Sequence, residues 1–169
     1  MKTLKTKTLL VLFAMLLIIT VKAQNTAISK TVNTVISNYL ALKDALKTAN
    51  GDDAKSAAKT LLTSIKEVPK ANFNKSQLSI WTSYEAKLQF DSRHISEVDH
   101  LAHQREHFAS LSKNLYTILK GLKLNRQTLY WQYCTMRSTY YISESANGKD
   151  PYMGMENCSK VKDTLQMVK

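Results

Sequence analysis

Apolar residues recur at steps of three and four through most of the chain, the spacing that places side chains on one face of an α-helix. The first run predicts a helix over residues 25–49, which ends at Asn50-Gly51. The acidic pair after this stop can cap a second helix, which extends to about Val68 because Pro69 cannot continue it. The inward positions of these two helices are Ile28, Val32, Val35, Ile36, Tyr39, Leu42, Leu46, Ala54, Ala57, Ala58, Leu61, Leu62 and Ile65.

Two further helical runs follow a short connection. The third helix begins near Ser76, and the fourth runs from about Ser96 to Leu122, with Gly121 near its end. We expect a break or tight turn within residues 91–96, although this segment contains neither Gly nor Pro. The apolar positions of the two helices are Leu78, Trp81, Tyr84, Leu88, Leu101, Phe108, Leu111, Leu115, Ile118 and Leu119.

The pattern changes after Leu124. Residues 129–133 are aromatic and partly alternating, which predicts a short strand, and residues 140–143 can form a second one. The composition of residues 147–151 predicts a turn, and residues 158–168 are expected to close the chain as a short helix. The predicted fold class is therefore mostly α: an antiparallel bundle of about four helices with a small, irregular or short-strand C-terminal cap.

The first 23 residues predict a secretory signal peptide. A lysine-rich start precedes an apolar stretch over residues 9–19, and Val21-Lys22-Ala23 offers the small residues at which cleavage occurs. The apolar stretch is too short for a comfortable membrane span. We therefore expect an exported, periplasmic protein without stable membrane insertion after cleavage; an uncleaved N-terminal anchor is the alternative. The remaining residues 24–169 form a single domain, with a helical body over 25–124 and the cap over 125–169.

The net charge of the chain and its distribution limit the classes of partner that we expect. The whole chain has a formal charge of +11, and the four lysines of the predicted signal peptide account for four of these charges, which leaves +7. The remaining lysines are spread along the predicted helices without a dense run, as is typical of a solvated basic surface. Together with the predicted export, this distribution argues against nucleic acid as a partner.

Sulfur-containing side chains are concentrated near the C-terminus. Residues 24–133 contain neither Cys nor Met, although Met is a common filler of apolar cores. Thiolates and thioethers together are the soft ligand set that suits Cu(I), and Ag(I) should behave likewise. Two or three such ligands around one ion would form a low-coordinate site. The candidate ligands are Cys134, Met136, Met153, Met155 and Cys158.

A disulfide is the competing interpretation of the two cysteines, because exported proteins retain such bonds. A bridge between Cys134 and Cys158 would close a loop of 25 residues. On the chain-entropy model this closure is worth roughly 3–4 kcal/mol. The methionines would then pack around the bridge. The clustering of sulfur alone does not decide between the two interpretations.

The histidines indicate a second candidate metal site. All four lie between His94 and His107, and on one continuous helix His100, His103 and His107 fall within a sector of roughly 60°. Such a stripe can hold zinc, either as a harder site or as a shell around the soft one. The alternative is that these rings make ordinary hydrogen bonds or face solvent.

The segment His103-Gln104-Arg105-Glu106-His107 also matches the H-x-x-E-H pattern of some zinc peptidases. Three fixed positions in five residues match often by chance. The sequence has no Gly-rich phosphate loop, no nucleophile elbow and no convincing Ser, His and Asp set. We therefore expect a protein that is not an enzyme.

Several segments of the chain match the sequence elements of a known family of domains. The cap carries a Tyr-x-x-x-Cys-x-Met element at Tyr130–Met136, with Thr135 where that family has proline. It also carries an ending similar to Asn-Pro-Tyr-x-Gly…Met…Cys-Gly, with Ser159 in place of the last glycine. Through segments 39–46, 103–112, 130–136, 141–143 and 150–158, the chain resembles the domain-of-unknown-function 3347 family.

The resemblance implies an exported bacterial domain, related to domains attached to heavy-metal efflux adaptors. It implies periplasmic handling of copper or silver. By matching position, it makes Cys134, Met136, Met155 and Cys158 the candidate ligands, with His107 as an imidazole donor.

Our leading hypothesis is a non-catalytic periplasmic protein that binds Cu(I) or Ag(I) and either buffers the metal or delivers it to an efflux component. The alternative is a protein-interaction module in which a disulfide between Cys134 and Cys158 attaches the cap to the helical body, with no role for metal.

Overall fold

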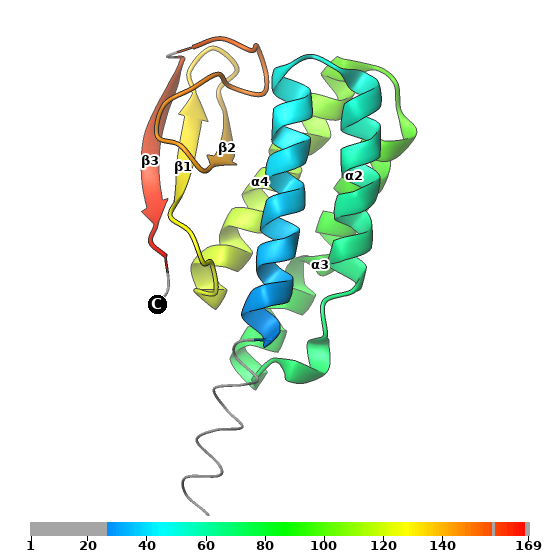
Figure 1. Ribbon diagram of the computed structural model, residues 1–169, viewed down its shortest axis with the longest axis vertical. Coiled ribbons are helices and arrows are strands. Elements are labelled where there is room, and N and C mark those ends of the chain that lie inside the picture. Colours follow the sequence, from blue (N-terminus) through cyan, green and yellow to red (C-terminus); the bar gives the residue numbers. More distant parts are fainter. Residues whose placement is uncertain (1–26, 157, 168–169) are drawn as a thin grey trace, which may run out of the picture.

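The computed structural model describes residues 27–156 and 158–167, which form four helices and a three-stranded sheet (Figure 1). The chain is helical from residue 27 to residue 47, and we call this part the first helix. The mostly-α prediction with a small strand cap is confirmed. The later helices are α2 (Gly51–Lys66), α3 (Lys75–Glu97) and α4 (Leu101–Leu122), with a short 3₁₀ turn at Lys70–Asn72.

Asparagine side chains start two of the helices. The Asn50 side chain accepts hydrogen bonds from the backbone N–H groups of Asp52 and Asp53 at the start of α2. Asn74 forms a reciprocal capping box with Gln77 at the start of α3. Because the first backbone N–H groups of a helix lack partners within the helix, these side chains determine where α2 and α3 begin.

The predicted break within residues 91–96 is wrong. Helix α3 continues to Glu97, because Asp91, Ser92 and Ile95 are buried and keep this segment packed on the bundle. The chain turns at residues 98–100 instead. The side-chain amide of the buried Gln104 stabilises this turn by donating hydrogen bonds to the carbonyls of Val98 (2.8 Å) and Gly51 (3.0 Å).

The C-terminal sheet has the strand order β2-β1-β3, and both pairs are antiparallel. Its strands are β1 (Leu129–Cys134), β2 (Thr139–Ser143) and β3 (Ser159–Leu165). The closing helix predicted at residues 158–168 is therefore wrong. The backbone of β3 satisfies the second edge of the central strand β1, and this non-local pairing overrides local helix preference.

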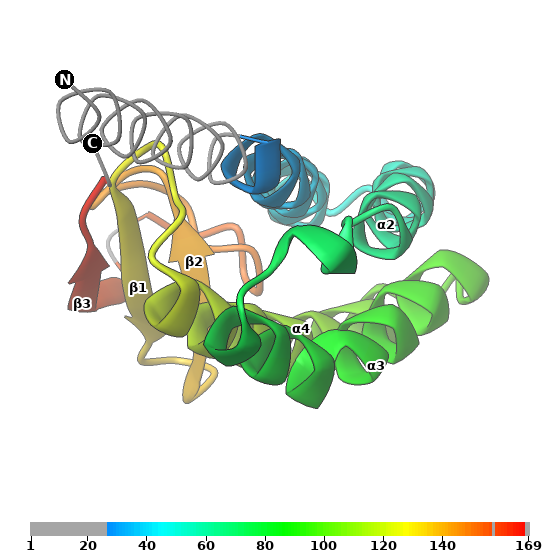
Figure 2. The same cartoon turned by 90° about the horizontal axis from the view of Figure 1, so that it is seen from below.

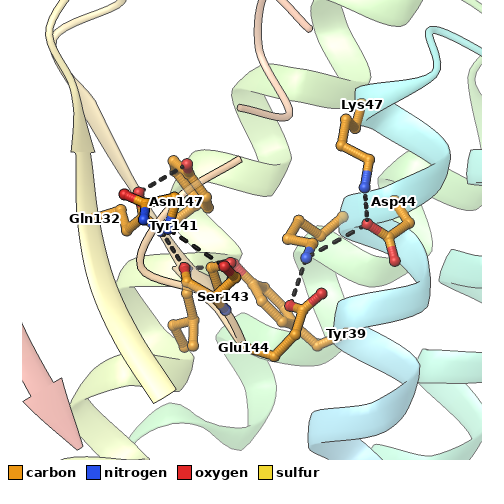
Figure 3. A network of polar contacts seen from close by, with 11 residues as sticks. Tyr39, Asp44, Lys47, Gln132, Tyr141, Ser143, Glu144 and Asn147 are labelled. Carbon is orange, nitrogen blue, oxygen red and sulfur yellow. Dashed lines mark hydrogen bonds and ion pairs between the residues drawn. The ribbon is translucent and has the colours of Figure 1, made fainter. Parts of the chain in front are cut away.

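The sheet lies beside the first helix and α4, away from α2 (Figures 1 and 2). The buried hydroxyl of Tyr39, on the first helix, accepts a hydrogen bond of 3.0 Å from the backbone N–H of Ile142 in β2. Lys43, one turn further along the first helix, forms an ion pair with Glu144 at 2.5 Å, and Figure 3 shows Glu144 together with Tyr39 and Asp44 of the first helix. One buried and one partly buried polar contact thus attach the cap to the helical body.

Among the helices that the structure describes, none is long and apolar enough to cross a membrane. The predicted signal peptide, residues 1–23, lies outside the described residues.

Candidate metal centre

Strand pairing brings the two cysteines together. Cys134 is the last residue of β1, and its backbone partner is Ser159, the first residue of β3. Cys158 immediately precedes that strand, so its side chain reaches the same end of the sheet. Both cysteines are free thiols, and their Sγ atoms lie 3.4 Å apart. Cys134 is fully buried, whereas Cys158 is partly accessible.

A buried carboxylate completes the group. Asp150 lies in the loop between β2 and β3, and its Oδ2 atom accepts a hydrogen bond of 2.9 Å from the Cys158 thiol. Its Oδ1 atom lies 3.7 Å from the Cys134 Sγ atom. Of the His, Cys, Asp and Glu side chains in the described ranges, these three form the one group whose ligand atoms all lie within 4.8 Å of one another. The group can hold a metal ion.

The loop is folded around the Asp150 carboxylate. The backbone N–H groups of Tyr152 and Met153 each donate to Oδ1 at 2.8 Å, and that of Met155 donates to Oδ2 at 3.1 Å. Gly154 lies in the left-handed region at φ +66°, and a Cβ at this position would come within 3.0 Å of the Lys47 carbonyl oxygen. Glycine is therefore required for the loop to close on itself and to approach the first helix.

These contacts lower the pKa of the carboxyl group and raise the pKa of the Cys158 thiol. Burial opposes ionisation of Asp150, but the hydrogen bonds from the Cys158 thiol and from three backbone N–H groups outweigh it, so the pKa of Asp150 lies below its ordinary value. Burial and the hydrogen bonds to Asp150 and Cys134 raise the pKa of Cys158 to about 12. Without metal, the site therefore contains an anionic carboxylate that accepts a hydrogen bond from a neutral thiol.

Arg105 of α4 attaches this loop to the helical body. Its Nε donates to the Pro151 carbonyl and its Nη2 to the Leu46 carbonyl, both at 2.9 Å. The guanidinium also interacts electrostatically with Asp150. The site therefore includes one fixed cation close to its carboxylate.

The three predicted methionine ligands have exposed side chains. Met136 is 61% exposed, Met153 44% and Met155 43%. The backbone N–H groups of Met153 and Met155 bind Asp150, so the loop itself positions these two residues. The carboxylate of the site and these two exposed thioethers therefore belong to the same loop.

The histidines lie on the helices. His103 and His107 belong to α4, and their ring centroids are 4.8 Å apart. His100 occupies the N-cap position, outside the helix, so the continuous helical stripe of three rings does not form. His94 of α3 takes its place, with its ring stacked on that of His107 at 4.7 Å.

Sequence reasoning missed Asp150 as a member of the site and assigned it only to a turn. The available signal was an aspartate before Pro151, in a chain with few acidic residues, between two cysteines. Asp side chains at such turns accept hydrogen bonds from the backbone two residues further on, which is the geometry found here.

The candidate site is a thiol–carboxylate group, formed by Cys134, Asp150 and Cys158, in the C-terminal cap of a helical bundle. A family model described as "Protein of unknown function (DUF3347)" matches residues 35–127, more than half of the chain. The chain therefore belongs to this family. The matched segment covers most of the helical body and ends before β1. Neither the comparison with curated proteins nor that with solved structures gives a match.

Proposed function

We propose that this protein binds a soft monovalent metal ion, Cu(I) or Ag(I), through the thiolates of Cys134 and Cys158. The observation that carries the proposal is the pair of free thiols 3.4 Å apart beside a buried carboxylate. The protein would act in the periplasm without catalysis, as a metal buffer or as a donor to an efflux component. Thiolate ligands favour Cu(I) over the harder cations of the periplasm.

The sulfur separation supports a bent site with a third ligand. With metal–sulfur bonds of about 2.3 Å, two thiolates in linear coordination lie about 4.6 Å apart, and two at a tetrahedral angle lie about 3.8 Å apart. The observed 3.4 Å is closer to the bent arrangement. Met153 and Met155 can supply the third ligand as thioethers, because the loop that carries them is anchored to Asp150.

Metal binding replaces protons at this site. On binding, the Cys134 and Cys158 thiols would each lose a proton to solvent, and the Cys158 thiol would no longer donate to Asp150. The resulting thiolates add negative charge next to an existing carboxylate. Arg105 lies where its guanidinium partly offsets this charge. With a monovalent ion the site would remain anionic.

The test is an anaerobic titration of the reduced protein with Cu(I) in competition with a chromophoric chelator. We expect the protein to retain one equivalent of Cu(I) at sub-nanomolar free metal. The Cys134→Ser, Cys158→Ser double variant should lose this binding, whereas Met167→Leu, which removes an exposed sulfur from the C-terminal end, should keep it. Equal retention by the double variant and the unaltered protein would refute the proposal.

A disulfide-stapled interaction module is the second candidate, because the same short Sγ–Sγ separation allows oxidation to a bridge. Counting free thiols in protein isolated from its native compartment under acid quench separates the two. Two reactive thiols per chain support metal binding. A chain without reactive thiols, which gains two after reduction, supports the module.

A further inference from the structure

We propose that His94, His103 and His107 form a second metal site on the helical body, suited to a divalent ion of borderline softness such as Zn²⁺. The three rings come from two helices that lie side by side, α3 and α4. His107 occupies the centre, 4.7 Å from the ring of His94 and 4.8 Å from that of His103. Neutral imidazole is the most common protein ligand for such ions.

Each of the three rings makes a hydrogen bond through its Nδ1 atom. The Nδ1 atom of His107 lies 3.0 Å from an Asp91 oxygen, that of His103 lies 3.2 Å from a Glu106 oxygen, and that of His94 lies 3.2 Å from the Phe90 carbonyl oxygen. Ionised carboxylates and carbonyls only accept hydrogen bonds, so each Nδ1 carries the proton. Each Nε2 atom therefore retains the lone pair that a metal requires.

Asp91 is a carboxylate in the position that metal sites use to orient a ligand. Its side chain is only 4% exposed, and that of His107, its hydrogen-bond partner, is 17% exposed. A buried carboxylate without a partner is costly, so its burial here depends on the imidazole. Metal-binding histidines usually donate their second N–H to such a group, which fixes the ring and increases the basicity of the free nitrogen.

The histidine cluster is separate from the thiol group. Arg105, between His103 and His107 in sequence, points to the cap and bonds the Pro151 carbonyl. On a helix with 3.6 residues per turn, positions 103 and 107 lie roughly 160° from position 105. The histidines therefore occupy the opposite side of α4, against α3.

Binding requires two of the three side chains to rotate. Nitrogen ligands on a tetrahedral Zn²⁺ at 2.0–2.1 Å lie about 3.4 Å apart. The ring centroids of His94 and His103 lie 4.7 and 4.8 Å from that of His107, and the ring nitrogens of the three histidines do not all lie within 4.8 Å of one another. In the proposed bound state, the rings of His94 and His103 would turn towards His107, which keeps its hydrogen bond to Asp91, and would give up their present Nδ1 contacts. Water would supply the fourth ligand.

The experiment is a titration with Zn²⁺ against a chromophoric indicator, using the Cys134→Ser, Cys158→Ser variant so that no thiol contributes. We expect one equivalent to bind. His107→Gln and His94→Gln should each weaken binding at least tenfold, and Asp91→Asn should weaken it by about 10–100-fold. His100→Gln is the matched control, because His100 lies at the N-cap outside the cluster, and it should leave the affinity unchanged.

A second readout is independent of affinity. In ¹⁵N-resolved NMR spectra, Zn²⁺ should shift the Nε2 signals of His94, His103 and His107 and leave those of His100 in place. Far-UV circular dichroism confirms that each variant folds. The proposal would be overturned if His100→Gln weakened Zn²⁺ binding as much as His107→Gln does. It would also be overturned if Zn²⁺ caused no shift of the Nε2 signals. Because the background lacks both thiols, its failure is independent of any failure at the Cu(I) site.

Discussion

The helical body and the C-terminal cap are stabilised by different kinds of interaction. The body buries a periodic set of apolar side chains, with Trp81, Leu88 and Phe108 fully inaccessible. The loop of the cap is instead organised by one buried carboxylate, that of Asp150, which binds three backbone N–H groups and a thiol. The helical body therefore depends on many apolar contacts, whereas the loop of the candidate thiol site depends on a single charged group.

The two regions can be followed separately by fluorescence. Trp81 is buried in the body next to Phe73, and Trp131 is stacked between Tyr116 of α4 and Tyr140 of β2. In a Trp81→Phe background, emission reports on the cap alone, while far-UV circular dichroism reports mainly on the helices.

The largest effect is expected from Phe108→Ala, which breaks the contact between the two regions. The ring is fully buried, stacked on Tyr39 at 5.1 Å and packed against Tyr152 of the cap at 6.0 Å. The cavity should lower the free energy of unfolding by about 3–5 kcal/mol, as measured by urea denaturation. Both probes should shift together. Phe90→Ala, at a ring that is 48% exposed, is the control and should have a much smaller effect.

The second-largest loss of stability is expected from Asp150→Asn, which keeps the shape of the side chain and removes its charge. One carboxylate oxygen that accepts from Met155 and Cys158 becomes an N–H₂ group, so donors face donors. We expect a loss of about 2–4 kcal/mol. Trp131 emission should report unfolding at lower urea than circular dichroism does. Coincident transitions would mean that the cap and body unfold as one unit.

The same carboxylate predicts a dependence on pH. Because the folded pKa of Asp150 lies below its ordinary value of 3.8, its contribution is complete above that value and is lost as the pH falls through the folded pKa. The difference in unfolding free energy between the unaltered protein and Asp150→Asn should therefore be constant at neutral pH and shrink below pH 3.8. Urea denaturation at a series of pH values measures this. A difference that grows towards low pH would contradict the assignment.

The smallest effect is expected from Tyr39→Phe, which removes a hydrogen bond at the boundary of the two regions. The variant keeps the ring and leaves the buried N–H of Ile142 without its acceptor. We expect a loss of about 1–3 kcal/mol in the free energy of unfolding. Tyr133→Phe is the matched control, because that ring contacts Tyr140 and Lys162 and should cost less. Equal losses in the two variants would exclude a specific role for the Tyr39 hydroxyl.

Most of the helical body could be predicted from sequence because helix packing follows a local rule. The predicted inward positions of the first helix, from Ile28 to Leu46, are all buried. Leu78 is an exception, at 36% exposed, since it lies in the first turn of α3, near the end of the bundle. The end of α3 was misplaced because it depends on the side chain of Gln104, which belongs to the next helix.

The candidate site was predictable only in its atom types. The residue types alone show that Cys134 and Cys158 are soft ligands and that His103 and His107 can bind metal. The residue types do not show which side chains lie next to them. The 3.4 Å separation of the thiols requires β3 to pair with β1, and this strand was expected to be a helix.

Periodicity and side-chain chemistry are local properties, so the helical body, its core and the chemical classes of the possible ligands follow from the amino-acid sequence. The packing of distant segments, in contrast, brings Asp150 to the two thiols and His94, not His100, to His107. Both arrangements depend on contacts between segments far apart in the chain. Such contacts are fixed by the packing of whole elements, which no short stretch of sequence encodes.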